Sequence, residues 1–375
     1  MEVKGVVEEL RSAIILGLPL KPPLVKHIFV NRKEEVELIL RDIWGIEKTG
    51  RGGARLILGG AGLGKTTLIE YIRGYVYENV ENALFSYVEL RPLSDIQPKV
   101  FNLELYKKVL EEIEDRDGRR GKELLTHISE KLHNKFSGIL DKASLKLGRV
   151  RLGVVRKFEK IGGHRSTLLA LAAMVFDDLN PIAYDYVSAS RNLEPDEARA
   201  IRERLGVRIP WGLREADLIA SLTAIIRAAE AAGYRVTIIA IDELEVLASW
   251  RRDWIARVLP KLTAYIEVSH SIPCYILVTC TPEFWRGDKS VEKIYPFLYQ
   301  RLNLSSIVSK ELPRKDAVML VHKIYSLYKK SLGSSAVEGI DVKYIAERIV
   351  DKAGGHPKTI VQMAIQEIES RIIGV

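Results

Sequence analysis

The chain has 375 residues, of which 47% are hydrophobic and 28% are charged, a balance typical of soluble globular proteins large enough for two or more domains. Its two cysteines exclude a disulfide framework and a cysteine-rich zinc site and suit a reducing cytoplasm, and no apolar run is long enough to span a membrane. The net charge of +8 is compatible with a nucleic-acid partner, and the scarcity of glutamine beside abundant Lys, Arg and Glu favours a heat-adapted source.

The N-terminal part of the sequence is predicted to be an irregular arm followed by a helix. Residues 1–30 contain the pair Pro22-Pro23 and show no signal-peptide pattern. Asn31 can cap a helix that begins at Arg32 and carries two glutamates in its first turn, where acidic side chains suit the helix dipole. A glycine-rich loop over residues 48–53 then leads to a short buried strand, 55–58.

The stretch after this strand fits the phosphate-binding loop G-x-x-x-x-G-K-[ST]. A helix is predicted from Leu68 onward, so the motif lies between a strand and a helix, as that loop requires. Glycines let several backbone N–H groups converge on phosphate oxygens, while Lys65 can reach the β- and γ-phosphates and Thr66 can ligate Mg²⁺. The alternative is a glycine-rich turn that matches by accident, and the flanking elements argue against it. We expect ATP or ADP to contact Gly59, Gly60, Ala61, Gly62, Leu63, Gly64, Lys65, Thr66 and Thr67.

Four further apolar runs and a long helical stretch complete the prediction of the fold. The runs cover 84–90, 236–241, 274–280 and 304–308, and their nearly continuous apolar character is what buried parallel strands require. Residues from about 103 to 232 show helical periodicity and are too many for one crossover helix, which predicts an inserted helical subdomain. We therefore predict an α/β fold, a three-layer P-loop NTPase core over residues 1–309 with a mainly parallel sheet, followed by a helical lid over 310–375.

Two acids, Asp242 and Glu243, directly follow the apolar run that ends at Ile241, which is a Walker B pattern. Asp242 is expected to hold Mg²⁺ opposite Thr66. Glu243 is expected to orient or deprotonate the attacking water, because phosphoryl transfer depends on positioning and charge stabilisation. An acidic turn exposed to solvent is the alternative, and it loses weight because the phosphate loop is present.

Three other positions are candidates for contact with the phosphates. Thr279 closes the next buried strand, where a hydroxyl can serve as sensor 1; Thr281 is the second choice, and an ordinary strand end before a proline turn is the alternative. Arg301 ends a predicted helix and could act as an arginine finger on a neighbouring subunit, or be an ordinary helix-end cation. Lys358 follows a Gly-Gly-His-Pro turn and could act as sensor 2 from the lid, or belong only to a helix stop.

A strongly basic segment covers residues 142–165. Apolar and polar residues alternate in places around Gly148, which suggests a hairpin, and a protruding positive hairpin could contact the phosphate backbone of DNA. The alternative is a solvated charged face. The segment holds a single acid, Glu159, against Lys142, Lys146, Arg149, Arg151, Arg156, Lys157, Lys160 and Arg165.

These motifs, in this order, resemble those of the AAA+ superfamily, and residues 31–35 look like its segment that lines the adenine pocket. A closer match from about residue 30 to 368 rests on the strings at 241–245, 281–285 and 295–302. They are similar to the P-loop ATP-binding proteins of BREX-type phage-defence clusters, relatives of origin-recognition ATPases. The resemblance implies that the sensor strand lies between the phosphate-loop and Walker B strands, and it implies an association with DNA. Origin-recognition proteins carry a C-terminal winged helix, whereas this sequence ends at Val375, so we expect no DNA recognition by such a domain.

The main hypothesis is a Mg²⁺-dependent, cytoplasmic ATPase of the AAA+ type that acts as a nucleotide-controlled module in a DNA-associated complex. It would work as a homo-oligomer or with a partner protein, away from membranes. A signalling switch of the STAND type, acting through protein partners without DNA, is the alternative because the Gly-Gly-His-Pro turn fits that class as well. A nucleotide-binding structural subunit is a third hypothesis, and the intact motif residues argue against it.

Overall fold

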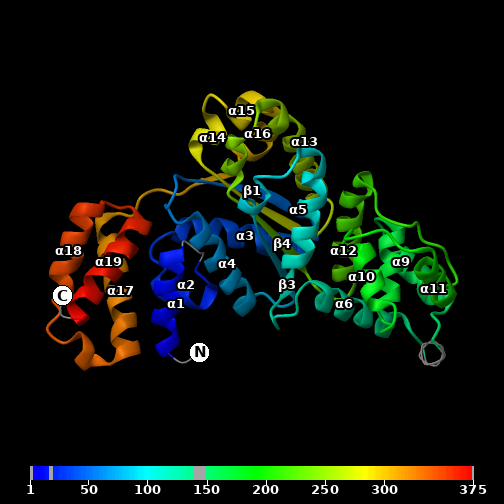
Figure 1. The fold of residues 1–375 in the computed structure, drawn as a ribbon, viewed down its shortest axis with the longest axis horizontal. Coiled ribbons are helices and arrows are strands. Elements are labelled where there is room, and N and C mark those ends of the chain that lie inside the picture. The colour runs from blue at the N-terminus through cyan, green and yellow to red at the C-terminus, as the bar shows by residue number, and fades with distance from the viewer. Residues whose placement is uncertain (1–2, 17–19, 139–147, 374–375) are drawn as a thin grey trace.

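A six-stranded sheet forms the centre of the computed structural model, which describes residues 3–16, 20–138 and 148–373 (Figure 1). The strand order is β3-β2-β4-β5-β1-β6. All neighbouring pairs are parallel except β2 and β3. The strands are β1 (Gly53–Leu58), β2 (Ala83–Glu89), β3 (Glu114–Asp115), β4 (Val236–Asp242), β5 (Cys274–Cys280) and β6 (Ser306–Val308).

The predicted α/β fold with a mainly parallel sheet is confirmed. Every residue of β4 and β5 is buried, which is why these strands read as continuous apolar runs. Strand β5 pairs with β1 on one side and with β4 on the other, as the resemblance implied. The short antiparallel strand β3 was not predicted; it has only two residues, and both are acids paired with arginine.

Helices cover both faces of the sheet (Figure 1). One apolar cluster joins α3 (Lys33–Thr49) and α4 (Lys65–Asn79) to one face, and a larger cluster joins α5 (Pro98–Glu112) and α13 (Arg252–Ser269) to the other. The short helices α14 (Pro282–Arg286), α15 (Val291–Ile294) and α16 (Pro296–Asn303) follow β5. This is the three-layer arrangement expected when parallel strands alternate with crossover helices.

The region between β2 and β4 is mostly helical and extends to one side of the sheet in Figure 1. Helix α9 lies at its centre, and all of its residues after the first are buried. After α5, its helices are α6 (Gly121–Phe136), α8 (Leu152–Glu159), α9 (Arg165–Ala173), α10 (Asn180–Val187), α11 (Pro195–Leu205) and α12 (Leu218–Ala231).

The predicted hairpin around Gly148 is wrong in its described part. From Leu152 the chain forms helix α8, which buries Val154, Val155 and Phe158 on one side. Their spacing, i, i+1 and i+4, is that of a helical face, whereas a strand would alternate buried and exposed positions. Of the basic residues of this segment, Lys142 and Lys146 lie outside the described residues.

The C-terminal helices α17 (Arg314–Leu332), α18 (Val342–Ala353) and α19 (Pro357–Ile373) share a separate apolar cluster on the other side of the sheet (Figure 1). Residues from the N-terminal part of the chain, including Val7 and Leu10, belong to the same cluster. None of the helices within the described ranges combines the length and the apolar content needed to cross a membrane.

The prediction of an irregular N-terminal arm is wrong. The arm forms α1 (Val3–Leu16) and α2 (Pro22–Ile28). Helix α1 buries Val7 and Leu10, one turn apart, against the C-terminal helices, and the proline pair occupies the start of α2, where the missing N–H groups cost nothing. The next helix begins at Lys33, and its N-cap is Arg32 in the left-handed region rather than Asn31.

Candidate nucleotide-binding site

The carboxyl ends of β1, β4 and β5 meet beside a cavity of about 320 Å³. Residues of the phosphate loop, the end of β2 and the start of the turn after β4 line one part of it. Apolar residues from the N-terminal part and from the C-terminal helices line the rest. In open parallel sheets this edge is where ligands bind, because loops from several strands converge there.

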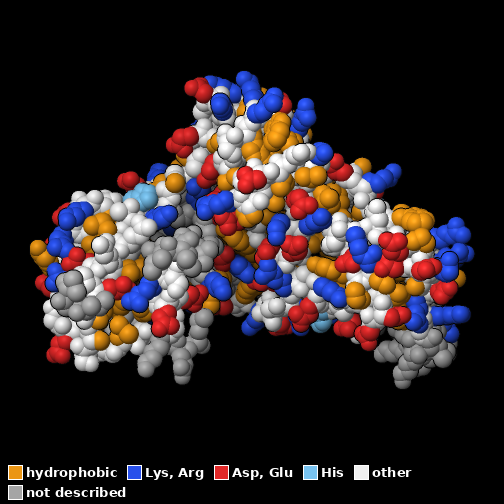
Figure 2. Space-filling model, in the orientation of Figure 1, with side chains coloured by type: hydrophobic (Ala, Val, Ile, Leu, Met, Phe, Trp, Pro, Cys, Tyr) orange, Lys and Arg blue, Asp and Glu red, His pale blue; other side chains and the backbone are white. Residues whose placement is uncertain are grey.

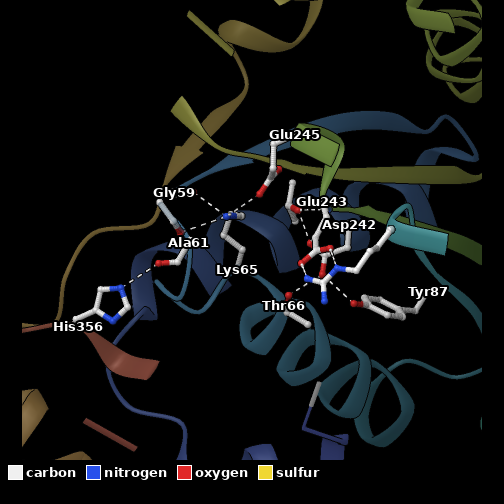
Figure 3. Close-up of polar contacts among 12 residues, drawn as sticks. Gly59, Ala61, Lys65, Thr66, Tyr87, Asp242, Glu243, Glu245 and His356 are labelled. Atoms are coloured by element: carbon white, nitrogen blue, oxygen red, sulfur yellow. Dashed lines mark hydrogen bonds and ion pairs between the residues drawn. The ribbon is translucent and has the colours of Figure 1, made fainter. Parts of the chain in front are cut away.

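The phosphate loop has the backbone that its glycines permit. Gly62 and Gly64 have φ angles of +74° and +82°, and α4 begins at Lys65 directly after Gly64. A side chain at Gly62 would collide with His356, so the loop and the start of α19 approach each other closely. The Nε2 atom of His356 lies 2.9 Å from the carbonyl oxygen of Ala61 (Figure 3). The N–H of Lys358 donates to the carbonyl of Gly62 at 3.3 Å.

Lys65 is buried and turned toward the loop itself (Figure 3). Its ammonium donates to the carbonyl oxygens of Gly59 at 2.7 Å and Gly60 at 3.2 Å, and it lies 3.4 Å from a carboxylate oxygen of Glu245. The ammonium that is predicted to reach the phosphates is therefore bound to the carbonyl oxygens of its own loop and to Glu245.

Asp242 and Thr66 lie together, as predicted for a pair of magnesium ligands. The Thr66 hydroxyl donates to Oδ2 of Asp242 at 2.6 Å, and the Tyr87 hydroxyl donates to the same oxygen at 2.8 Å (Figure 3). Burial, and then the Asp242 carboxylate, raise the pKa of Tyr87, which keeps this hydroxyl a donor. The described residues hold no group of three or more His, Cys, Asp or Glu side chains suited to a metal. A hydroxyl and a carboxylate do fit Mg²⁺, which takes few protein oxygens and fills its shell with phosphate and water.

Thr279, the first choice for sensor 1, is fully buried beside Asp242 and Glu243. Its hydroxyl donates to Oδ1 of Asp242 and accepts the backbone N–H of Glu243 at 2.9 Å. Thr281, the second choice, is the N-cap of α14 and its side chain makes no capping hydrogen bond. The hydroxyl of Thr279 thus holds the Asp242 carboxylate and the backbone of Glu243 in place at the Walker B turn.

Glu243 does not face Lys65. Its backbone is left-handed, with φ +64°, and its carboxylate accepts two hydrogen bonds from Arg91, at 3.0 Å from Nε and 2.5 Å from a terminal nitrogen. Glu89 lies close by, and burial, then the Glu243 charge, raise its pKa. The residue predicted to orient water is therefore engaged by a cation from the end of β2.

Of the two remaining predicted residues, Lys358 lines the cavity and Arg301 is not among the residues that line it. Arg301 is half-exposed, lies 2.9 Å from Glu267 and stacks over the ring of Phe297 at 5.1 Å. Arg301 therefore does not line the cavity of its own chain. This position agrees with both alternatives, contact with a neighbouring subunit and an ordinary surface role.

Arg32 lines the cavity and belongs to the segment 31–35, which the resemblance placed at the adenine pocket. Four residues of the site were not predicted: Tyr87, Arg91, Glu245 and His356. Arg32 is buried and donates to carbonyl oxygens of Leu63 and Lys310, so it ties the phosphate loop to the segment before α17. Tyr87 and Arg91 lie near the Walker B acids because β2 is the neighbour of β4 in the sheet, and they could have been predicted if that pairing had been known. The sequence did not supply that pairing.

Glu70 is a further unusual acid on the helix that follows the loop. It is buried, and Arg73 lies 3.3 Å from it. Burial raises the pKa of Glu70 to about 7, against the pull of Arg73. Arg73 also pairs with Glu114 of β3, which links this helix to the edge of the sheet.

This chain is similar to several solved structures, and the three described next share low sequence identity with it. The Walker-type ATPase PABY2304 of Pyrococcus abyssi is 14% identical with a TM-score of 0.43, over 92% of this chain and 72% of that chain. The Aeropyrum pernix ORC1 protein, solved in complex with DNA, is 11% identical with a TM-score of 0.44, over 96% and 64%. Domain III of the Thermotoga maritima replication initiation protein DnaA is 12% identical with a TM-score of 0.39, over 93% and 89%.

Comparison by sequence gives one family. No curated protein matches the chain significantly. Residues 192–368 match the family described as BREX system ATP-binding protein BrxC/D. The matched part includes Asp242, Glu243, Thr279, Arg301 and Lys358, and the phosphate loop precedes it. The predicted resemblance is confirmed over these residues: from 192 to 368 this chain is similar to the ATP-binding proteins of BREX systems.

Proposed function

We propose that this protein binds ATP with Mg²⁺ in the cavity beside β1 and β4 and hydrolyses it to ADP and phosphate. The observation that carries the proposal is the hydrogen bond of 2.6 Å between Thr66 and Asp242, which joins the phosphate loop to the Walker B strand. Mg²⁺ held by these two oxygens would bridge and neutralise the phosphates, which is what phosphoryl transfer needs from a protein. Lys65 and the N–H groups of the loop would hold the phosphates.

Glu243 is our candidate for orienting the attacking water, and Thr279 for fixing the turn that carries Glu243. In this proposal residues 310–375 act as a lid over a core of residues 1–309. The contacts of His356 and Lys358 with the phosphate loop support this proposal, because they join residues 310–375 to the site.

Two substitutions test the assigned roles. Lys65→Ala is expected to abolish ATP binding measured by titration calorimetry, because the only lysine of the loop motif is removed. Glu243→Gln is expected to bind ATP normally and to lose phosphate release. Undiminished turnover in Glu243→Gln would refute the role of this glutamate, and unchanged ATP binding in Lys65→Ala would refute the site.

We further propose that hydrolysis depends on a neighbouring subunit that contributes Arg301. The support is its half-exposed position away from its own cavity, next to the exposed ring of Phe297. Turnover per subunit should rise with protein concentration in the wild type and stay low in Arg301→Ala. A concentration-independent rate that Arg301→Ala leaves intact would favour the ordinary surface role.

DNA is the partner we propose for the basic segment 142–165. Arg149, Arg156 and Lys160 are exposed, whereas Arg165 pairs with Glu159. Figure 2 shows Lys and Arg side chains at the outer end of the helical region, mixed with Asp and Glu. Replacing the three exposed cations by Gln should weaken DNA binding and lower the slope of log K against log salt by about 2 to 3. The same change at Lys315, Lys329 and Lys343, exposed on the C-terminal helices, is the matched control.

A STAND-type switch is the second candidate function. The contact of the Gly-Gly-His-Pro turn with the phosphate loop favours it, since such a contact could hold a bound nucleotide for long periods. Slow hydrolysis, co-purified ADP and indifference to DNA would support the switch. Repeated turnover that DNA or protein concentration accelerates would support the AAA+ ATPase.

A further inference from the structure

Lys65 has no free hydrogen-bond donor in this structure. A lysine ammonium has three N–H groups, and here they face the carbonyl oxygens of Gly59 and Gly60 and the carboxylate of Glu245. The distances are 2.7, 3.2 and 3.4 Å. A phosphate that binds Lys65 must therefore displace one of these partners, and the longest contact is the one to Glu245.

Glu245 is a partly buried acid, with 22% of its side chain exposed, and it follows the left-handed turn at Glu243. It lies at the start of the short 3₁₀ helix Leu244–Ser249, and its side chain points toward Lys65 (Figure 3). One carboxylate oxygen faces Lys65, and the other is buried with no hydrogen-bond partner among the described residues. Burial raises the pKa of Glu245 while Lys65 lowers it, so the lysine is the main source of stabilisation for its charge.

The two glutamates of the Walker B string are thus engaged by different cations. Arg91 holds Glu243 at the solvent side, whereas Glu245 faces the lysine of the phosphate loop. Glu245 also lines the cavity in which the nucleotide is proposed to bind. If Lys65 reaches the β- and γ-phosphates of a nucleotide, the negative charge of Glu245 beside it would lie near the terminal phosphate.

We infer that Glu245 is an internal counter-ion of Lys65 that competes with the terminal phosphate and so sets the preference between ATP and ADP. This inference rests on the proposed nucleotide site. Lysine in such loops reaches the β- and γ-phosphates, so ATP must displace Glu245 and then tolerate its charge beside the γ-phosphate. Two like charges a few ångströms apart repel appreciably in a partly buried site. ADP lacks the γ-phosphate and meets less of this repulsion.

Glu245→Gln tests the inference, with Mg²⁺-ATP and Mg²⁺-ADP affinities measured by titration calorimetry. Removing the charge should tighten ATP binding by about tenfold and ADP binding by no more than about twofold, because a repulsion of roughly 1 to 2 kcal/mol is relieved mainly at the γ-phosphate. Glu245→Asp keeps the charge and should keep the wild-type ratio of the two affinities. Glu338→Gln removes an exposed acid elsewhere and is the matched control.

The outcomes separate this inference from the proposed function. Wild-type protein that binds neither nucleotide overturns the proposed site and the inference together. Wild-type protein that binds both, with an unchanged affinity ratio in Glu245→Gln, overturns the inference alone. Weaker ATP binding in Glu245→Gln also overturns it, because the carboxylate would then support the nucleotide. Glu245→Ala also removes the charge and should shift the affinity ratio toward ATP in the same way, so it keeps the test decisive if the glutamine variant does not fold.

Discussion

The ion pair between Arg91 and Glu243 is expected to restrain hydrolysis. Glu243 can orient water only if its carboxylate is free to face the γ-phosphate, and two hydrogen bonds from Arg91 now hold it. Replacing Arg91 by alanine removes both hydrogen bonds and leaves Glu243 in place. We expect a higher rate of phosphate release at saturating ATP and little change in ATP affinity.

The size of this effect follows from exposure. The side chain of Arg91 is 64% exposed and that of Glu243 is 24% exposed, so solvent screens much of the attraction. Such a pair contributes about 1 kcal/mol, which corresponds to roughly a fivefold increase in kcat. For a deeply buried ion pair we would expect a much larger increase in kcat.

Steady-state phosphate release with Mg²⁺-ATP measures the effect. Arg91→Lys keeps the charge but loses the two-pronged geometry and should give an intermediate rate. Arg214→Ala is the matched control, because Arg214 forms a similar exposed pair with Asp217 at 3.0 Å. A kcat of Arg91→Ala equal to or below that of the wild type would refute the reasoning that the pair restrains Glu243.

Three further predictions concern the surroundings of the phosphate loop. Burial raises the pKa of Glu70 from 4.5 to about 7, so the folded protein binds the carboxyl proton more tightly than the unfolded chain does. The protonated carboxyl therefore adds to the free energy of unfolding in full below about pH 4.5, and this addition is lost as the pH rises through 7. Glu70→Gln should flatten a decline of up to about 3 kcal/mol in the free energy of unfolding between pH 4.5 and 8, measured with urea, and an unchanged decline would contradict it. Gly62→Ala should weaken ATP binding about tenfold in calorimetry, through its positive φ and its contact with His356, whereas Gly118→Ala, also at positive φ but in open space, should not. Thr279→Val should lower both the melting temperature and the rate of phosphate release, since it leaves a buried carboxylate oxygen and an N–H without the hydroxyl; Thr281→Val should leave the rate near wild type.

The phosphate loop and the Walker B strand were readable from the sequence because each is a local signal. Glycine spacing allows one backbone path, and a run of apolar residues ending in acids marks a buried strand with its functional end. The helical character of the region between β2 and β4 was equally local, since it follows from periodicity. Boundaries of strands β1, β2, β4 and β5 fell within two residues of those predicted.

The N-terminal helices and the segment after Gly148 show where such signals fail. Helix α1 is stabilised by packing against α17 and its neighbours, a contact between residues more than 300 positions apart that no local pattern reports. Helix α8 was mistaken for a hairpin because a short alternation is compatible with both periods over a few residues.

The sequence by itself therefore predicted Lys65, Thr66 and Asp242 as ligands of a nucleotide and a magnesium ion, and Glu243 as the residue that orients water. Only the tertiary structure decided which charges face one another. Strand pairing placed Tyr87 and Arg91 beside the Walker B acids, and the left-handed turn at Glu243 directed that glutamate to Arg91 and left Lys65 to Glu245. The physical reason is that a motif consists of residues close together in the sequence, so its chemistry can be recognised there. The partner of each charge depends instead on the order of the strands and on the φ angle of Glu243, which neighbouring residues do not fix.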